Sequence, residues 1–223
     1  MSSITALYRY PVKGLSAETL DRASILDTGT VAGDRILGLL FADAGPAVED
    51  GWWPKDRFTV LMNTPALARL RAHFDATRSR ISIVLDESTL VDEPLNESGR
   101  RRIAEVITEY VLGLDENPLR NRPDRAPLRL VGDINSPMFH DGGAKHITLM
   151  GRASVNSLAE AAGQEIDERR FRMNLVLDNI EPWEELTWIG HTIRVGGLDF
   201  DVTGPVVRCV ATHANPENGN RDI

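Results

Sequence analysis

The stretch GPVVRCVATHANPENG, residues 204–219, contains the only cysteine of the 223-residue chain. Cys209 directly follows Arg208, and a run of turn-forming residues comes after it. A thiol beside a cation at the end of a strand can have a lowered pKa, and its thiolate is a nucleophile or a soft metal ligand. A second interpretation stays open at this point, in which Cys209 is a small buried hydrophobic residue.

The composition is typical of a folded, water-soluble protein, with 42% hydrophobic and 26% charged residues. The net charge of -8 argues against nucleic acid as a partner, because affinity for phosphate backbones depends on clustered Lys and Arg. No apolar run reaches the roughly 18 residues that span a bilayer, and residues 1–14 lack the pattern of a signal peptide. We therefore expect no membrane association and a cytoplasmic location.

Several common kinds of site have no support in the sequence. One cysteine forms neither an internal disulfide nor a four-cysteine zinc site, and neither a P-loop nor a GxGxxG motif is present. The spacing of Cys209 and His213 does not favour a cysteine hydrolase, because the fold normally brings such partners together. The histidines show no metal-ligand spacing and are predicted to be surface or structural residues: His73, His140, His146, His191 and His213.

The N-terminal half reads mainly as strands. The runs 4–12, 18–26 and 34–43 are rich in β-branched and large apolar residues and are separated by glycine-containing turns, and 81–85 is a buried-type strand. A helix is predicted from Pro65 onward, because apolar residues recur at helical spacing: Leu67, Leu70 and Phe74. The clearest helical stripe ends near Gly113 and consists of Ile103, Val106, Ile107, Tyr110 and Val111.

Residues 115–127 contain three prolines and no periodicity, so a domain boundary is predicted there. The runs 127–131, 146–150 and 171–178 read as strands, and a helix passes through Val155 and ends at Gly163. A hairpin is predicted where two strands flank a glycine pair, at 191–195 and 198–202. The sequence therefore predicts a mixed α+β, β-rich fold.

Basic residues also stand at several predicted strand ends, in YPVKGLS (10–16), GDRILGLLF (33–41) and RRFRMNLVLD (169–178). Together with the 204–219 stretch, and in this order, these segments closely resemble the MOSC superfamily, named for the C-terminal domain of molybdenum cofactor sulfurase. The resemblance implies an N-terminal β-barrel-type domain over residues 1–115 and a β-barrel-like MOSC domain over 122–223, with a few helices. It also implies that the MOSC domain is shortened at its C-terminus, since the family usually continues with further strands.

The subgroup to which the chain is most similar contains the mitochondrial amidoxime reducing component and bacterial N-hydroxylated-base reductases. Cys209 falls where that family places its molybdenum-ligating cysteine, so the resemblance implies that it is the metal ligand and the catalytic residue. The family's lysine motif contacts the phosphate of the pterin, and other motif positions bind the same cofactor. In this sequence the implied cofactor-binding residues are Lys13, Gly14, Arg35, Ser154, Arg172, Asn174 and Arg208.

The resemblance implies molybdopterin with molybdenum as the cofactor, and pyridoxal phosphate is not expected. The pterin dithiolene would supply two sulfur ligands, and the thiolate of Cys209 a third. The implied reaction transfers an oxygen atom from a small N-oxygenated substrate to the metal. A separate protein would deliver the electrons, because the sequence has no cysteine-rich iron–sulfur domain. Two alternatives stay open: a sulfur carrier or cofactor-handling protein with a Cys209 persulfide, and a non-catalytic binding scaffold.

Overall fold

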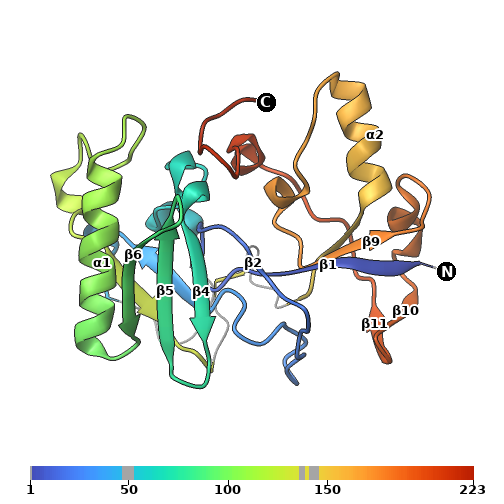
Figure 1. Cartoon of the computed structure of the whole chain (residues 1–223), viewed down its shortest axis with the longest axis horizontal. Helices are drawn as coiled ribbons and strands as arrows, with labels where there is room; N and C mark the ends of the chain where they lie inside the picture. Colours follow the sequence, from blue (N-terminus) through green and yellow to red (C-terminus); the bar gives the residue numbers. More distant parts are fainter. Residues whose placement is uncertain (1, 47–52, 136–138, 141–145) are drawn as a thin grey trace.

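The computed structural model describes residues 2–46, 53–135, 139–140 and 146–223 (Figure 1). This part of the chain is rich in strands and contains two α-helices, which confirms the predicted mixed α+β, β-rich fold class. Short 3₁₀ helices lie between the longer elements: η1 (Ala42–Ala44), η2 (Lys55–Arg57), η3 (Pro65–Arg69), η4 (Pro123–Arg125), η5 (Glu168–Phe171), η6 (Glu184–Trp188) and η7 (Val210–His213).

One side of the molecule is a packed layer formed by a three-stranded antiparallel sheet and a helix. The strands are β4 (Arg71–Asp75), β5 (Arg80–Leu85) and β6 (Ser88–Pro94), and α1 (Glu97–Leu112) packs on them (Figure 1). The helix begins where the side chain of Asn96 accepts a hydrogen bond of 2.9 Å from the backbone N–H of Gly99. Its apolar stripe is buried in the main hydrophobic cluster, as the spacing of these residues predicted.

The other side contains a four-stranded sheet in the order β2 (Glu18–Thr19), β1 (Ser3–Arg9), β9 (Leu175–Asp178) and β8 (Leu149–Gly151). Strands β8 and β9 are parallel, and α2 (Arg152–Ala162) forms the crossover between them. A separate hairpin, β10 (Thr192–Val195) and β11 (Leu198–Asp201), turns at Gly196 and Gly197. Both glycines have positive φ angles, 59° and 85°, as a tight two-residue hairpin turn requires.

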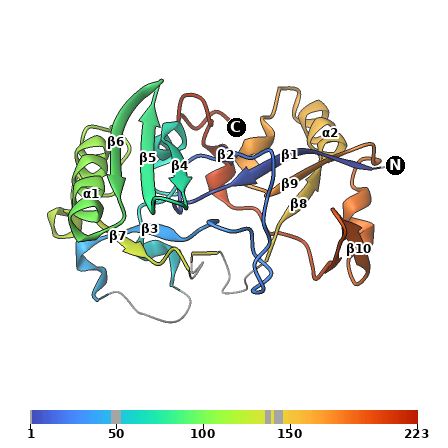
Figure 2. The same cartoon turned by 60° about the horizontal axis from the view of Figure 1, so that its bottom comes forward.

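Strand pairing connects the two halves of the sequence at two places. Strand β1 pairs with β9, and β3 (Leu37–Leu40) pairs antiparallel with β7 (Arg129–Gly132), as Figure 2 shows from a second direction. Among the described residues, the strands form four separate sheets and no closed barrel. The domain limits 1–115 and 122–223 stay predictions. The first and last parts of the chain therefore complete each other's sheets.

Two local predictions were wrong. The apolar spacing after Pro65 was interpreted as one helix, but the chain forms the short 3₁₀ helix η3 and then strand β4. A helical spacing arose because Leu67 packs from the 3₁₀ turn while Phe74 packs from an alternating strand. The run 18–26 was predicted as a strand, but only its first two residues form one, β2, and Ile25 makes an isolated bridge with Val31.

No helix in the described part of the chain has both the length and the apolar character needed to cross a bilayer.

Candidate functional site

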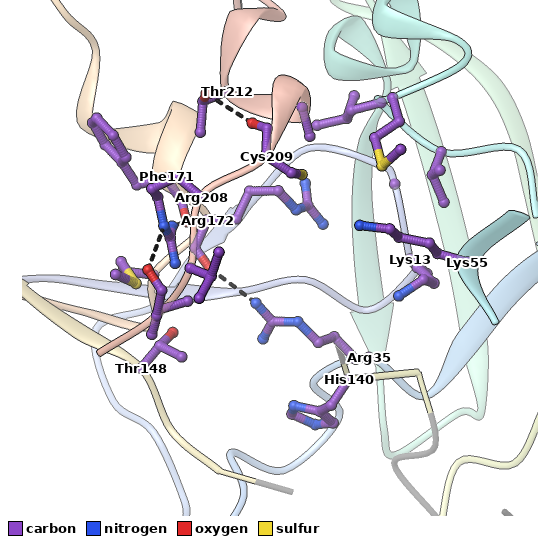
Figure 3. A pocket seen from close by; sticks show the side chains of 18 of the residues that line it. Lys13, Arg35, Lys55, His140, Thr148, Phe171, Arg172, Arg208, Cys209 and Thr212 are labelled. Carbon is purple, nitrogen blue, oxygen red and sulfur yellow. Dashed lines mark hydrogen bonds between the residues drawn. The ribbon is translucent and has the colours of Figure 1, made fainter. Parts of the chain in front are cut away.

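A pocket brings together residues from both halves of the sequence (Figure 3). Its empty space, open solvent at the mouth included, is about 960 Å³. Six of the eight predicted site residues line it: Lys13, Gly14, Arg35, Arg172, Arg208 and Cys209. Lys13 and Cys209, which are 196 positions apart in sequence, thus meet at one pocket.

The lining of this pocket is strongly cationic. Its charged side chains are Lys13, Lys55, Arg35, Arg170, Arg172 and Arg208, and no carboxylate belongs to the described part of the lining. The chain as a whole has a net charge of -8, so the pocket concentrates positive charge in a protein that is negatively charged overall. Such a cluster favours an anionic ligand, because Lys and Arg form charge-assisted hydrogen bonds with phosphate and carboxylate oxygens.

Lys13 and Gly14 form one wall of the pocket. Lys13 follows a bridge between Val12 and β3, and its side chain is largely buried, with Nζ donating a hydrogen bond of 3.0 Å to the backbone oxygen of Phe139. Gly14 has a φ of +88°, and a Cβ at this position would lie 3.1 Å from the Cα of Val60. A larger residue at position 14 would therefore be strained and would press against the pocket wall.

Two of the predicted arginines are held by stacking on Tyr10. The guanidinium carbons of Arg35 and Arg172 lie 5.0 and 4.3 Å from the centre of its ring. Arg35 Nη2 also donates to the backbone oxygen of Arg172 at 2.9 Å, and Asp34 forms an ion pair with Arg35. Burial raises the pKa of the Tyr10 phenol, although both arginines oppose the shift, so the ring stays neutral between them.

Cys209 is exposed and lines the pocket immediately before η7, so the interpretation as a buried hydrophobic residue was wrong. Its backbone oxygen accepts hydrogen bonds from both the N–H and the hydroxyl of Thr212, at 3.1 and 3.0 Å. Arg208 Nη1 donates to the backbone oxygen of Phe171 at 2.7 Å. The residue before Cys209 is thus connected to the segment that carries Arg172.

Arg170 is a site residue that the sequence reasoning missed, although it lies in the same motif as Arg172. Its side chain is only 4% exposed and forms an ion pair of 2.6 Å with Asp222. Its Nη1 donates to the backbone oxygens of Thr212 and His213, at 3.3 and 3.1 Å. Arg170 therefore holds the 3₁₀ turn that follows Cys209 against the pocket.

Two predicted cofactor contacts lie outside the pocket lining. The hydroxyl of Ser154 donates to Glu185 and accepts from the backbone N–H of Trp183, both at 2.8 Å. Asn174 is buried, and its side-chain amide contacts Thr148 and the backbone oxygen of Tyr8. Both side chains support strands and turns behind the site, and their contact with a cofactor stays a prediction.

His140 lines the pocket and is buried, so of the two roles predicted for the histidines the surface role does not apply to it. It is 5% exposed, and its Nε2 has no hydrogen-bond partner in the described part of the chain. Burial, reinforced by the charge of Arg35, lowers its pKa to about 4. Neither His140 nor Lys55 stands in a motif, so only their position in the fold identifies them.

The arrangement fits a ligand that has an anionic group and a soft metal. The cations would hold the anion, and the exposed thiol of Cys209 would reach the metal. No group of three or more His, Cys, Asp or Glu side chains is placed to bind a metal among the residues that the structure describes.

Comparison with known families divides the chain into two matched segments. Residues 1–110 match the family model described as MOSC N-terminal beta barrel domain, and residues 136–222 match the one described as MOSC domain. These matches overlap the ranges of the two predicted domains.

Curated relatives include three proteins named molybdenum cofactor sulfurase or molybdenum cofactor sulfurase 2. The Drosophila grimshawi protein is 40% identical over 119 residues, which is 49% of this chain and 14% of that protein. The Drosophila mojavensis protein is 40% identical over 75 residues, 33% of this chain and 9% of that protein. The Culex quinquefasciatus protein is 40% identical over 52 residues, which is 23% of this chain and 7% of that protein. The chain thus matches only a small part of these relatives' length.

Proposed function

The chain belongs to the MOSC superfamily and has the MOSC N-terminal beta barrel domain, and from this premise we propose that it binds the molybdenum cofactor and reduces N-oxygenated compounds. The observation that carries the proposal is the cationic pocket with an exposed cysteine at its wall. A cofactor with a phosphate group and a thiolate-ligated metal matches both features. The names of the curated relatives, which include this cofactor, support the same assignment.

Individual residues would divide the binding. Lys13, Arg35 and Arg172 would hold the anionic part of the cofactor through charge-assisted hydrogen bonds. Cys209 would bind the metal through its thiolate, and Arg170 and Arg208 would keep the cysteine segment in place. When bound, molybdenum in its pterin supplies two-electron oxygen-atom transfer, while the protein contributes binding and orientation.

The substrate we propose is a small N-hydroxylated or N-oxide compound. Cys209 is exposed, so a small molecule can approach it from solvent without movement of the packed layer. The apolar side chains of Val206 and Val207 line the same pocket and offer contact area for the carbon skeleton of such a compound. The electrons would come from a separate donor protein.

A second candidate function is sulfur transfer, with a persulfide on Cys209. The curated relatives are named as sulfurases, and an exposed thiol beside Arg208 suits a sulfur carrier as well as a metal ligand. In this case the Cys209 thiolate would attack the outer sulfur of a persulfide on a donor protein, the donor's thiolate would leave, and Cys209 would pass that sulfur on. The cationic pocket would then recognise the anionic acceptor.

The first test is the molybdenum and pterin content of protein made in a host that synthesises the cofactor. We expect close to one metal and one pterin per chain, and reduction of a hydroxylamine-type compound with an artificial electron donor. Cys209→Ala should lose that activity and keep its fold, because the side chain is exposed. Val210→Ala, at a residue 47% exposed directly after Cys209 and outside the described pocket lining, is the matched control and should keep both.

The same preparation separates the two functions. Turnover that persists in Cys209→Ala would exclude the metal-ligand role. A gain of one sulfur on Cys209 in the intact mass, in protein without molybdenum, would instead favour the sulfur carrier.

A further inference from the structure

The imidazole of His140 has a buried nitrogen, Nε2, at the wall of the pocket. It is 5% exposed, and no hydrogen bond to its Nε2 is found in the described part of the chain. Leaving such a group unsatisfied costs stability, so nearly all buried side-chain polar atoms in proteins have a partner. An unsatisfied nitrogen that lines a pocket is accordingly a candidate contact for a ligand.

The surroundings of His140 indicate which ligand group it would meet. Its neighbour in sequence, Phe139, accepts a hydrogen bond from Lys13 through the backbone oxygen, and the charges of Arg35 and Lys13 both act on the imidazole. Figure 3 shows the His140 ring beside Arg35 and on the same side of the pocket as Lys13. His146 lies next to it, with ring centres 6.3 Å apart. This end of the pocket is therefore suited to an anion.

A neutral donor has an advantage at this place. Burial and the neighbouring cations lower the pKa of His140 to about 4, so the ring carries no charge near neutral pH. A neutral imidazole can donate one N–H without adding a third positive charge to Lys13 and Arg35. It can also approach an oxygen of the anion without being repelled by the charges of Lys13 and Arg35.

We propose that His140, in the tautomer with a proton on Nε2, donates a hydrogen bond to an oxygen of a phosphate group bound at the Lys13 end of the pocket. This assignment rests on the proposed function, in which that group is the phosphate of the pterin cofactor. An anionic group on the substrate has the same chemistry, and the test below distinguishes the two sources. His140 is thus a binding residue that supplements the cations.

A ligand-binding role and a structural role predict opposite effects on stability. If the role of His140 is to bind a ligand, His140→Leu removes an unsatisfied buried nitrogen. The melting temperature of the ligand-free protein should then stay unchanged or rise. His140→Gln keeps an amide N–H that can donate, so it should preserve most of the binding. A melting temperature of ligand-free His140→Leu far below wild type would overturn the proposal.

The binding experiment titrates inorganic phosphate into ligand-free wild type, His140→Leu and His140→Gln, followed by calorimetry and by the NMR signals of the histidine rings. We expect phosphate to bind about 10–100 times more weakly to His140→Leu, as for the loss of one hydrogen bond to a charged group. His140→Gln should lie closer to wild type. Equal affinity in all three proteins would overturn the proposal.

The source of the anion is then read from protein made in a cofactor-producing host. Less pterin per chain in His140→Leu than in His140→Gln supports the pterin phosphate as the bound group. Equal pterin content together with weakened phosphate binding and a raised KM supports an anionic substrate. If wild type holds no pterin, the proposed function fails, and the phosphate titration still decides the role of His140.

Discussion

The packed layer of β4, β5, β6 and α1 and the C-terminal segment 202–223 are stabilised in different ways. Apolar side chains that are completely buried join the sheet to the helix, among them Ile81, Ile83, Ile103 and Ile107. The C-terminal segment instead exposes much of its apolar surface. Hydrogen bonds from arginines to backbone oxygens hold it, from Arg170 to His213 and from Arg221 to Met62. Figure 1 shows the segment between the two sides of the molecule.

This difference shows where stability and chemistry are located. The packed layer excludes water, and Leu61 of the pocket lining belongs to the same hydrophobic cluster. The C-terminal segment has little burial of its own, yet it carries Cys209. Its geometry depends on residues elsewhere in the chain, because Arg170 binds the backbone of residues 212 and 213. Mutations in the packed layer should therefore lower stability, whereas mutations in the C-terminal segment should mainly affect function.

The largest effect on stability should come from Ile107→Ala in the packed layer. The side chain is fully buried, so its truncation leaves a cavity and should lower the free energy of unfolding by about 2–5 kcal/mol. Urea unfolding measures the change, with Val207→Ala as the exposed control that should stay within about 0.5 kcal/mol. If both variants lost the same stability, the contrast between the two regions would be wrong.

The pocket should contribute to the pH dependence of stability, because the buried imidazole of His140 lines it. The pKa of His140 falls from its ordinary 6.5 to about 4 on folding, so between these values the unfolded chain binds a proton that the folded chain does not. Its contribution is therefore fully present above pH 6.5 and is lost as the pH falls toward 4, by at most about 3 kcal/mol. Urea unfolding of wild type and His140→Leu from pH 4 to 7 measures this contribution. If the free energy of unfolding changed with pH equally in the two proteins, this contribution of His140 would be contradicted.

Arg170→Lys tests how the cysteine segment is held. Lysine keeps the charge near Asp222 but cannot reproduce the paired contacts with the oxygens of Thr212 and His213. We expect local opening of the segment to become easier by about 1–3 kcal/mol, with global stability less affected. Hydrogen exchange at the amides of Thr212 and Ala214 measures it.

The matched control for this variant is Arg194→Lys, in the exposed ion pair with Asp199 on the β10–β11 hairpin. It should leave exchange at residues 212 and 214 unchanged. Unaltered protection of these amides in Arg170→Lys would mean that other contacts fix the cysteine.

The smallest effect we predict is that of Gly14→Ala at the junction of the packed layer and the pocket. A positive φ costs a non-glycine residue about 1–2 kcal/mol, and the new Cβ would also lie close to Val60. Gly45→Ala is a suitable control, because Gly45 has φ +83° and open space around it. Thermal unfolding should give Gly14→Ala a lower melting temperature than Gly45→Ala. The reverse order would show that the backbone near Val60 moves enough to accommodate the added Cβ.

Local patterns predicted the elements whose burial follows from neighbours in sequence. The stripe from Ile103 to Val111 became α1, and the glycine pair at 196–197 became the hairpin turn. The pattern after Pro65 failed because a 3₁₀ turn and a strand can share a helical spacing over a few residues. The motifs identified most of the pocket, whereas His140 and Lys55 have no motif that could have revealed them.

By itself, the sequence determined the fold class, the family and the residue types that meet at the site, because periodicity and short motifs depend on neighbouring residues. Only the tertiary structure decided that Cys209 is exposed, that Arg170 supports its segment, and that Ser154 lies outside the pocket. It also decided that His140 is buried and that its Nε2 has no hydrogen-bond partner among the described residues. The physical reason is that burial, hydrogen-bond partners and local charge depend on residues far away in the chain, which meet only when the sheets pair.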